Sequence, residues 1–91
     1  DETRRAQELA QAAERSDYTE EVVRLKAHVQ HARGCLEEDA PVGKRLNFLV
    51  QEMHREANTI GSKTSDVDVA GSVLSLKEEI EKLREQVQNV E

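Results

Sequence analysis

Hydrophobic residues recur along this chain at intervals of three and four, with polar and charged residues between them. Two series are especially regular, because their steps alternate between four residues and three. Alternating steps of this kind place the hydrophobic side chains on one stripe of an α-helix, in a heptad pattern. The first series is Tyr18, Val22, Leu25, Val29, Ala32 and Leu36, and the second is Val69, Val73, Leu76, Ile80, Leu83, Val87 and Val90.

Residues with capping or helix-breaking preferences set the expected ends of these two helices. Thr19 is a good N-cap for the first helix, which we expect to span residues 19–38. Asp39-Ala40-Pro41 should end it, because the residue before a proline avoids the helical conformation. Asp66 is the expected N-cap of the last helix, which we expect to run to the C-terminus.

A third amphipathic segment lies between the two heptad series. It predicts a helix from Val42 to Ile60, ended by Gly61 at the position after the helix, where glycine is common. Its hydrophobic stripe is Val42, Leu46, Leu49, Met53, Ala57 and Ile60.

The first 18 residues carry a weaker helical pattern. Residues 2–15 predict a helix with a stripe of small residues around Leu9, and Ser16-Asp17 marks a break after it. We interpret residues 1–18 as the end of a preceding helix or a linker, and residues 19–91 as one helical domain. Short connections favour antiparallel neighbours, so the expected fold is all-α, with long heptad helices in an antiparallel bundle or hairpin.

Composition narrows the classes of protein that the chain can belong to. The 91 residues are 36% hydrophobic and 35% charged, with two aromatic residues, and no stretch approaches the ~20 apolar residues of a membrane span. One cysteine, Cys35, excludes an internal disulfide, and we interpret it as a small packed residue. No targeting segment is visible, so we expect a cytoplasmic protein without a membrane partner. A core of this size is marginal alone, which favours a homo-oligomer.

The charge is unevenly distributed, although the total is −6. Residues 42–64 carry four basic residues against two acidic ones, a balance of +2, whereas the segments before and after them each carry −4. A local cationic patch can bind phosphate on an acidic protein, because potentials are screened within ~8 Å. Ordinary surface composition explains the same four residues, which are Lys44, Arg45, Arg55 and Lys63.

The third helix has a second face that is unusual for a solvated surface. It combines an aromatic residue, Phe48, with acidic and basic groups. Glu52 and Glu56 lie one turn apart, and a divalent cation such as Mg²⁺ or Mn²⁺ would relieve their repulsion. Basic groups beside them, Arg45, Arg55 and Lys63, could hold phosphate oxygens. An ordinary solvated helix face would contain the same carboxylates and cations.

Residues 42–63 read VGKRLNFLVQEMHREANTIGSK, and this segment resembles the signature of the C-terminal domain of the YicC/YloC-like family. The tail over residues 79–91 resembles the natural C-terminus of that family, and the match runs from about Thr19 to Glu91. The chain departs from the family pattern at Asn47, where aspartate is expected, and at His54, where asparagine is common.

The resemblance implies a bacterial, metal-dependent endoribonuclease that cleaves RNA phosphodiester bonds and assembles as a ring-like hexamer. Members have a separate N-terminal domain that is absent here, and no small-molecule cofactor is expected. Under this reading Glu52, Glu56 and Arg55 are the catalytic candidates, and Glu52 and Glu56 hold Mn²⁺ or Mg²⁺. The candidates for RNA or phosphate binding are Lys44, Arg45, Arg55, Asn58, Thr59 and Lys63.

Two questions stay open at the level of sequence. The nucleophile is either a metal-bound water or the RNA's own 2′-hydroxyl group. The chain is either part of the enzyme or a non-catalytic module whose heptad helices drive oligomerisation. The exposed position of Phe48 favours the first, because a purely structural helix has no reason to expose an aromatic residue there.

Overall fold

The computed structural model describes residues 1–38 and 43–90, and it confirms the all-α fold class. Helices α1 (Glu2–Asp17), α2 (Thr19–Leu36), α3 (Gly43–Lys63) and α4 (Val67–Val90) follow one another along the chain, and no strand occurs in these residues. Helix α2 ends at Leu36, before the expected end at residue 38, and the expected start at Val42 and the stop at Asp39-Ala40-Pro41 lie outside the described residues.

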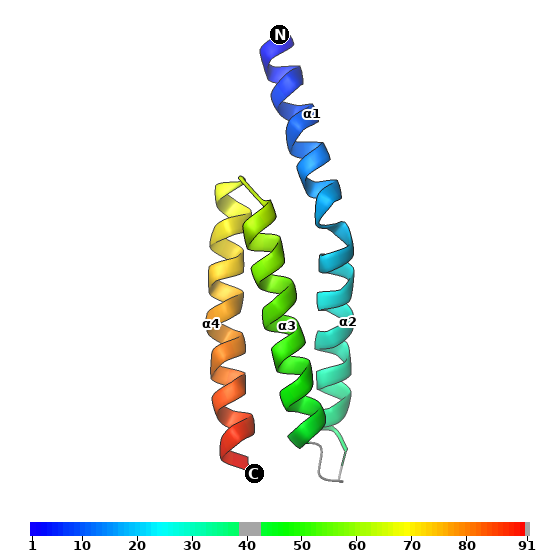
Figure 1. Ribbon diagram of the computed structural model, residues 1–91, viewed down its shortest axis with the longest axis vertical. Helices are drawn as coiled ribbons and strands as arrows, with labels where there is room; N and C mark the ends of the chain where they lie inside the picture. Colours follow the sequence, from blue (N-terminus) through cyan, green and yellow to red (C-terminus); the bar gives the residue numbers. More distant parts are fainter. Residues whose placement is uncertain (39–42, 91) are drawn as a thin grey trace.

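Helix α3 is the central element, because α2 and α4 both pack along it in antiparallel orientation (Figure 1). Helix α1 continues beyond the end of this three-helix array, so the molecule measures 58 × 19 × 15 Å. It contributes no buried residue. The bundle that the hydrophobic pattern predicts is therefore formed by α2, α3 and α4.

The core lies along the line where α3 meets its two neighbours. Val50 and Cys35 are its most buried members, each 1% exposed, which confirms that Cys35 is a packed residue. Leu36 was expected in the α2 stripe but is 62% exposed, because it is the last residue of that helix. The buried hydrophobic residues are Tyr18, Ala32, Cys35, Leu46, Leu49, Val50, Met53, Ala57, Ile60, Val73, Ile80 and Val87.

The structure confirms one expected helix start and corrects another. The Asp66 carboxylate accepts hydrogen bonds from the backbone N–H groups of Asp68 and Val69, at 2.8 and 3.3 Å, so it is the N-cap of α4. Thr19 is not the N-cap of α2. Its hydroxyl donates to the Arg15 carbonyl at 2.9 Å, and Tyr18 occupies the break between the helices without a side-chain cap.

The sequence predicts that Gly61 ends the third helix, and the structure shows that this is wrong. The helix continues to Lys63, and none of the described glycines has a positive φ angle. A Cβ atom at Gly61 would lie 3.2 Å from Cγ1 of Val73 on α4. The glycine therefore serves close packing between α3 and α4 rather than helix termination.

A polar contact ties α1 to the turn between α3 and α4. The Glu14 carboxylate accepts hydrogen bonds from the backbone N–H and the hydroxyl group of Ser65. These bonds hold the pKa of the Glu14 carboxyl below its ordinary value. Glu14 thus attaches the C-terminal part of α1 to the three-helix array.

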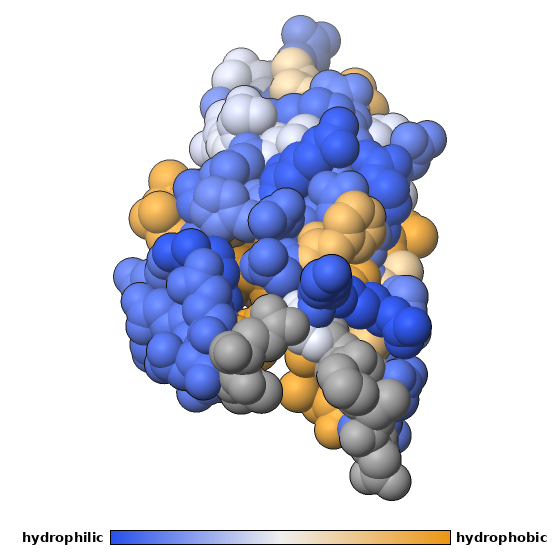
Figure 2. Space-filling view, turned by 60° about the horizontal axis from the view of Figure 1, so that its bottom comes forward, coloured by the Kyte–Doolittle hydropathy of each residue, from blue (hydrophilic) through white to orange (hydrophobic). Residues whose placement is uncertain are grey.

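A hydrophobic groove of about 220 Å³ lies between α2 and α4, above Met53 of α3. Its walls are Val29, Ala32, Arg33 and Leu36 on α2 and Leu76, Glu79, Ile80 and Leu83 on α4. Seen from the lower end of Figure 1, the surface is mainly hydrophilic, with hydrophobic side chains visible in several places (Figure 2). Within the described residues, no helix has the length and hydropathy needed to cross a membrane.

Candidate functional site

The side of α3 opposite its two neighbours carries Phe48, Glu52, Arg55 and Thr59, and we call it the outer face of α3. Phe48 is 57% exposed there, as the sequence predicts. Arg55 Nη1 lies 3.8 Å from Glu52 Oε2, and the Thr59 hydroxyl donates to the Arg55 carbonyl at 3.1 Å. The structure therefore keeps Glu52, Arg55 and Thr59 together on one accessible surface.

Glu56 faces α2 instead of this surface. Its carboxylate accepts hydrogen bonds from Arg24 Nε at 2.6 Å and from Arg24 Nη2 at 3.4 Å, and the residue is 7% exposed. The hydrogen bond that Arg24 donates to Glu56 is also the main reason why the pKa of Arg24 is raised above its ordinary value. Glu56 is thus committed to an ion pair between helices, although it lies one turn from Glu52.

Lys63, a candidate phosphate ligand, is also directed toward α2. Its ammonium group donates to the Glu21 carboxylate at 3.2 Å and to the Asp17 carbonyl at 2.9 Å. Glu21 is 6% exposed and also accepts a hydrogen bond from Arg24 at 3.1 Å. We call Glu21, Arg24, Glu56 and Lys63 the α2–α3 ion-pair network. Buried carboxylates need such partners, which explains why both cations are held there.

The other candidates lie at separate places along α3. Arg45 pairs with Glu38 beyond the end of α2, at 3.3 Å, and Lys44 is exposed in the first turn of α3. Asn58 faces α4, and its side-chain amide lies 3.1 Å from His54 Nδ1. The candidate residues therefore lie on different sides of α3, and Glu52, Arg55 and Thr59 lie together on its outer face.

The fit of a divalent metal can be tested on these positions. Mg²⁺ and Mn²⁺ prefer oxygen ligands, and protein-bound Mg²⁺ usually keeps several waters and takes one or two carboxylates. Both oxygens of Glu56 already accept bonds from Arg24, which leaves Glu52 as the one carboxylate of the pair with an accessible position. No group of three or more His, Cys, Asp or Glu side chains in residues 1–38 and 43–90 is arranged to hold a metal ion. A metal site formed by Glu52 and Glu56 together does not fit this packing.

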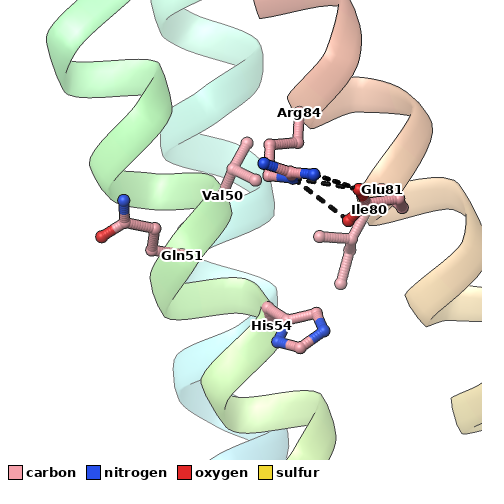
Figure 3. A pocket seen from close by; sticks show the side chains of 6 residues that line it. All are labelled: Val50, Gln51, His54, Ile80, Glu81 and Arg84. Atoms are coloured by element: carbon pink, nitrogen blue, oxygen red, sulfur yellow. Dashed lines mark hydrogen bonds and ion pairs between the residues drawn. The ribbon is translucent and has the colours of Figure 1, made fainter.

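A pocket of about 270 Å³, which the sequence did not predict, opens between α3 and α4. Figure 3 shows His54 directed toward α4, where Arg84 and Glu81 lie opposite it. Val50 and Ile80 form its hydrophobic part, and Gln51 also lines it. Arg84 donates to both oxygens of Glu81, at 3.1 Å each from Nε, and the pKa of Glu81 is held below its ordinary value mainly by this bond.

The spacing of some of these residues in the sequence does predict that they share a helix face. His54 and Asn58 are one turn apart on α3, and Glu81 and Arg84 are one turn apart on α4, so each pair shares a helix face. The register of α3 against α4 brings His54 to Glu81 and Arg84, and that register depends on packing contacts such as Gly61 against Val73.

Comparison with known proteins gives a consistent result. The family model described as "Endoribonuclease YicC-like, C-terminal" matches residues 1–91. A protein named "Probable endoribonuclease YicC" from Clostridioides difficile is 48% identical over 91 residues, which are 100% of this chain and 31% of that protein. A protein of the same name from Haemophilus influenzae is 42% identical over 85 residues, 93% of this chain and 30% of that protein. The chain thus spans about a third of the length of these relatives.

Proposed function

The chain belongs to the family of YicC-like endoribonucleases, as their C-terminal region, and we propose that it supplies RNA-contacting groups to a cytoplasmic, RNA-cleaving enzyme. The family and the two named relatives support RNA as the substrate class. The chain spans 31% and 30% of the length of these two relatives, so cleavage is proposed for the whole enzyme and RNA contact for this region.

The outer face of α3 is the observation that carries this proposal. An exposed aromatic ring can stack on an unpaired base, and a guanidinium group beside it can bind a phosphate. Phe48 is 57% exposed, and Arg55 is 77% exposed in its side chain, so both are accessible to a ligand. The ion pair of Arg55 with Glu52 is long, at 3.8 Å, and is weak enough to be replaced by a phosphate contact.

Within this proposal the residues have distinct roles. Arg55 holds a phosphate of the RNA, with Lys44 as a second cation on the same helix, while Phe48 stacks on a base. Glu52 is the carboxylate that this chain offers to a divalent metal ion or to the attacking nucleophile, either water or a 2′-hydroxyl group. Glu56, Lys63 and Arg45 hold α3 against α2 and act through its position.

The test measures RNA binding and RNA cleavage separately. Binding of a fluorescent single-stranded RNA to the chain is followed by anisotropy at several salt concentrations. We expect Arg55→Ala to weaken binding and to reduce the salt dependence by about one phosphate contact. Lys82→Ala is the matched control, because Lys82 is an exposed cation on α4 that also pairs with a carboxylate one turn away. Equal loss in both variants would remove the outer face from the proposal.

Cleavage is measured with the chain beside a full-length relative, in the presence of Mn²⁺, Mg²⁺ or a chelator. We expect Glu52→Gln in the chain, and the same change at the matching glutamate of the full-length relative, to reduce metal-dependent cleavage while RNA binding is retained. Product ends distinguish the nucleophiles, since attack by the 2′-hydroxyl leaves a cyclic phosphate and attack by water does not. If Glu52→Gln cleaves at the unchanged rate, Glu52 has no part in the chemistry.

The groove between α2 and α4 favours a second role, which is self-association. Its occupant in this proposal is a helix of a second copy of the chain, since α1 offers a stripe around Leu9 that is unburied within one copy. Helix α1 is 16 residues long, about 24 Å, and the stretch of α2 from Val22 to Leu36 is of similar length. Sedimentation should show dimers or larger species that Leu83→Glu abolishes, while Leu74→Glu, at an exposed leucine outside the groove, leaves them intact.

A further inference from the structure

The pocket between α3 and α4 has a composition that restricts what it can bind. Its floor is hydrophobic, formed by Val50 and Ile80, and its polar groups are the imidazole of His54, the guanidinium of Arg84 and the carboxylate of Glu81. We call it the His54 pocket. Arg84 and Glu81 are about half exposed, at 42% and 46%, so their pairing is screened by solvent and a ligand can compete for either partner.

Charge excludes the simplest ligands. A free anion would be attracted by Arg84 but repelled by Glu81. A metal cation would be attracted by Glu81 but repelled by Arg84. The hydrophobic floor also favours a flat ligand with an apolar face. A neutral heterocycle that carries hydrogen-bond donors and acceptors on its edge satisfies all three conditions, and a pocket of about 270 Å³ has room for one.

The hydrogen bond between Asn58 and His54 sets the polarity of the imidazole edge. The Asn58 amide nitrogen lies 3.1 Å from Nδ1, so a neutral ring that accepts this bond carries its proton on Nε2. His54 then presents a donor to the pocket, Arg84 presents further donors, and Glu81 presents acceptors only.

We propose that the His54 pocket binds one unpaired guanine base of RNA. Guanine carries two adjacent acceptors, N7 and O6, and two adjacent donors, N1–H and the N2 amino group. Arg84 and His54 face the acceptors, and the Glu81 carboxylate accepts from both donors. Adenine, cytosine and uracil each place an acceptor beside every donor on the corresponding edge, so none of them offers a carboxylate two adjacent donors. Unpaired bases are commonly read on these edges.

This inference rests on the proposed function for its ligand, since it takes RNA as the molecule that brings the base. It adds a specificity site on the α4 side of α3, separate from Phe48 and Arg55 on the outer face. The two sites lie on one helix, so a single RNA strand that crosses α3 can contact both.

The test compares four labelled nine-nucleotide RNAs, namely all-uridine and uridine with one central guanosine, adenosine or cytidine. Anisotropy titrations with the chain should show that the guanosine RNA binds about tenfold more tightly than the others, the discrimination expected of one well-paired base. The NMR signals of the histidines show where on the protein the RNA binds. His54 should shift with the guanosine RNA, whereas His28 and His31 on α2 serve as internal controls.

Two variants on α4 separate the pocket from general electrostatics. Glu81→Gln keeps the size of the side chain but replaces one acceptor with a donor, and we expect it to abolish the guanosine preference while binding of all-uridine RNA is retained. Glu78→Gln makes the same charge change at an exposed position of the helix and should leave the preference intact. Melting temperatures confirm that both variants are folded.

The outcomes distinguish this inference from the proposed function. RNA binding without a guanosine preference, or with a preference that Glu81→Gln retains, overturns the pocket and leaves the RNA-binding role. A separate titration uses guanosine monophosphate alone. If it shifts the NMR signals of His54 while no RNA binds, the result supports the pocket and contradicts the RNA-binding role. The absence of any RNA binding and of any His54 shift contradicts both.

Discussion

The two long interfaces of α3 hold their helices by different means. Toward α2, two carboxylates with exposures below 8%, Glu21 and Glu56, are paired with Arg24 and Lys63. Toward α4, the contact is mainly hydrophobic and includes the close approach of Gly61 to Val73, while the polar groups of the His54 pocket lie at its edge. Charged residues on one side of α3 are therefore used for folding, and those on the other sides remain accessible to ligands.

The largest expected effect is on the hydrophobic side. Ile80 is 4% exposed, and Ile80→Ala should cost about 2–5 kcal/mol of unfolding free energy. A chain of this size has roughly 5–10 kcal/mol in total, so much of the fold would be lost. Urea denaturation measures the change, with Leu74→Ala at an exposed leucine of the same helix as the control. A loss below 1 kcal/mol would show that the α3–α4 interface is not the main hydrophobic contact.

A smaller loss is expected on the charged side. Glu56→Gln removes the charge that Arg24 pairs with but keeps one acceptor, and Arg24 is half exposed and can be hydrated instead. The melting temperature should fall by about 5 °C. Arg24→Met together with Glu56→Leu should recover part of this loss, because a hydrophobic pair can replace a buried ion pair, while Glu21 loses Arg24 and keeps Lys63 as its partner. Failure of the double variant to recover would mean that the network fixes the α2–α3 register in a way that hydrophobic packing cannot.

Two glycines sharpen the comparison on the α4 side. A Cβ atom at Gly71 would meet nothing within 4 Å, so Gly71→Ala should stabilise the fold by about 0.5–1 kcal/mol through helix propensity. Gly61→Ala gains the same propensity but places its Cβ 3.2 Å from Val73, so its net gain should be less than half as large. Equal gains, measured by thermal unfolding, would show that the α3–α4 contact relaxes without cost.

The smallest effect concerns the attachment of α1. The pKa of Glu14 is lowered in the folded state, so the contact with Ser65 stabilises the fold above the unfolded-state pKa and is lost as pH falls through the lower folded-state value. Carboxyl NMR titration should show Ser65→Ala returning the pKa of Glu14 toward its ordinary value. Glu81, whose pKa is lowered mainly by its hydrogen bond with Arg84 on α4, is the control that the Ser65 substitution should leave unchanged.

The sequence predicted most of the fold because each helix carries its own periodic pattern. The predictions that were wrong on α3 all involve contacts with the neighbouring helices. The predicted hydrophobic stripe omitted Val50 and Glu56, but α3 contacts a helix on each flank, so the buried arc is wider than one stripe. Gly61 was assigned to a helix end because glycine is common there, whereas its reason for being glycine lies in α4.

The candidate site was predictable to a lesser degree. Exposure of Phe48 follows from its helix position alone and was correctly predicted. The pairing of Glu56 with Arg24, 32 residues away, follows from the packing of α2 on α3, which a helical wheel does not contain. The same applies to the His54 pocket, whose residues come from two helices. The division at residue 18 and the roles of the outer face remain predictions.

The central position of α3 has a consequence for how the molecule opens. Helices α2 and α4 are both held by α3, and α1 is held chiefly by its junction with α2 and by Glu14. Amide hydrogens of α3 are therefore shielded until both neighbours leave, while either outer helix can detach alone and α1 can fray at the least free-energy cost. A region built in this way can loosen one flank without unfolding the helix at its centre.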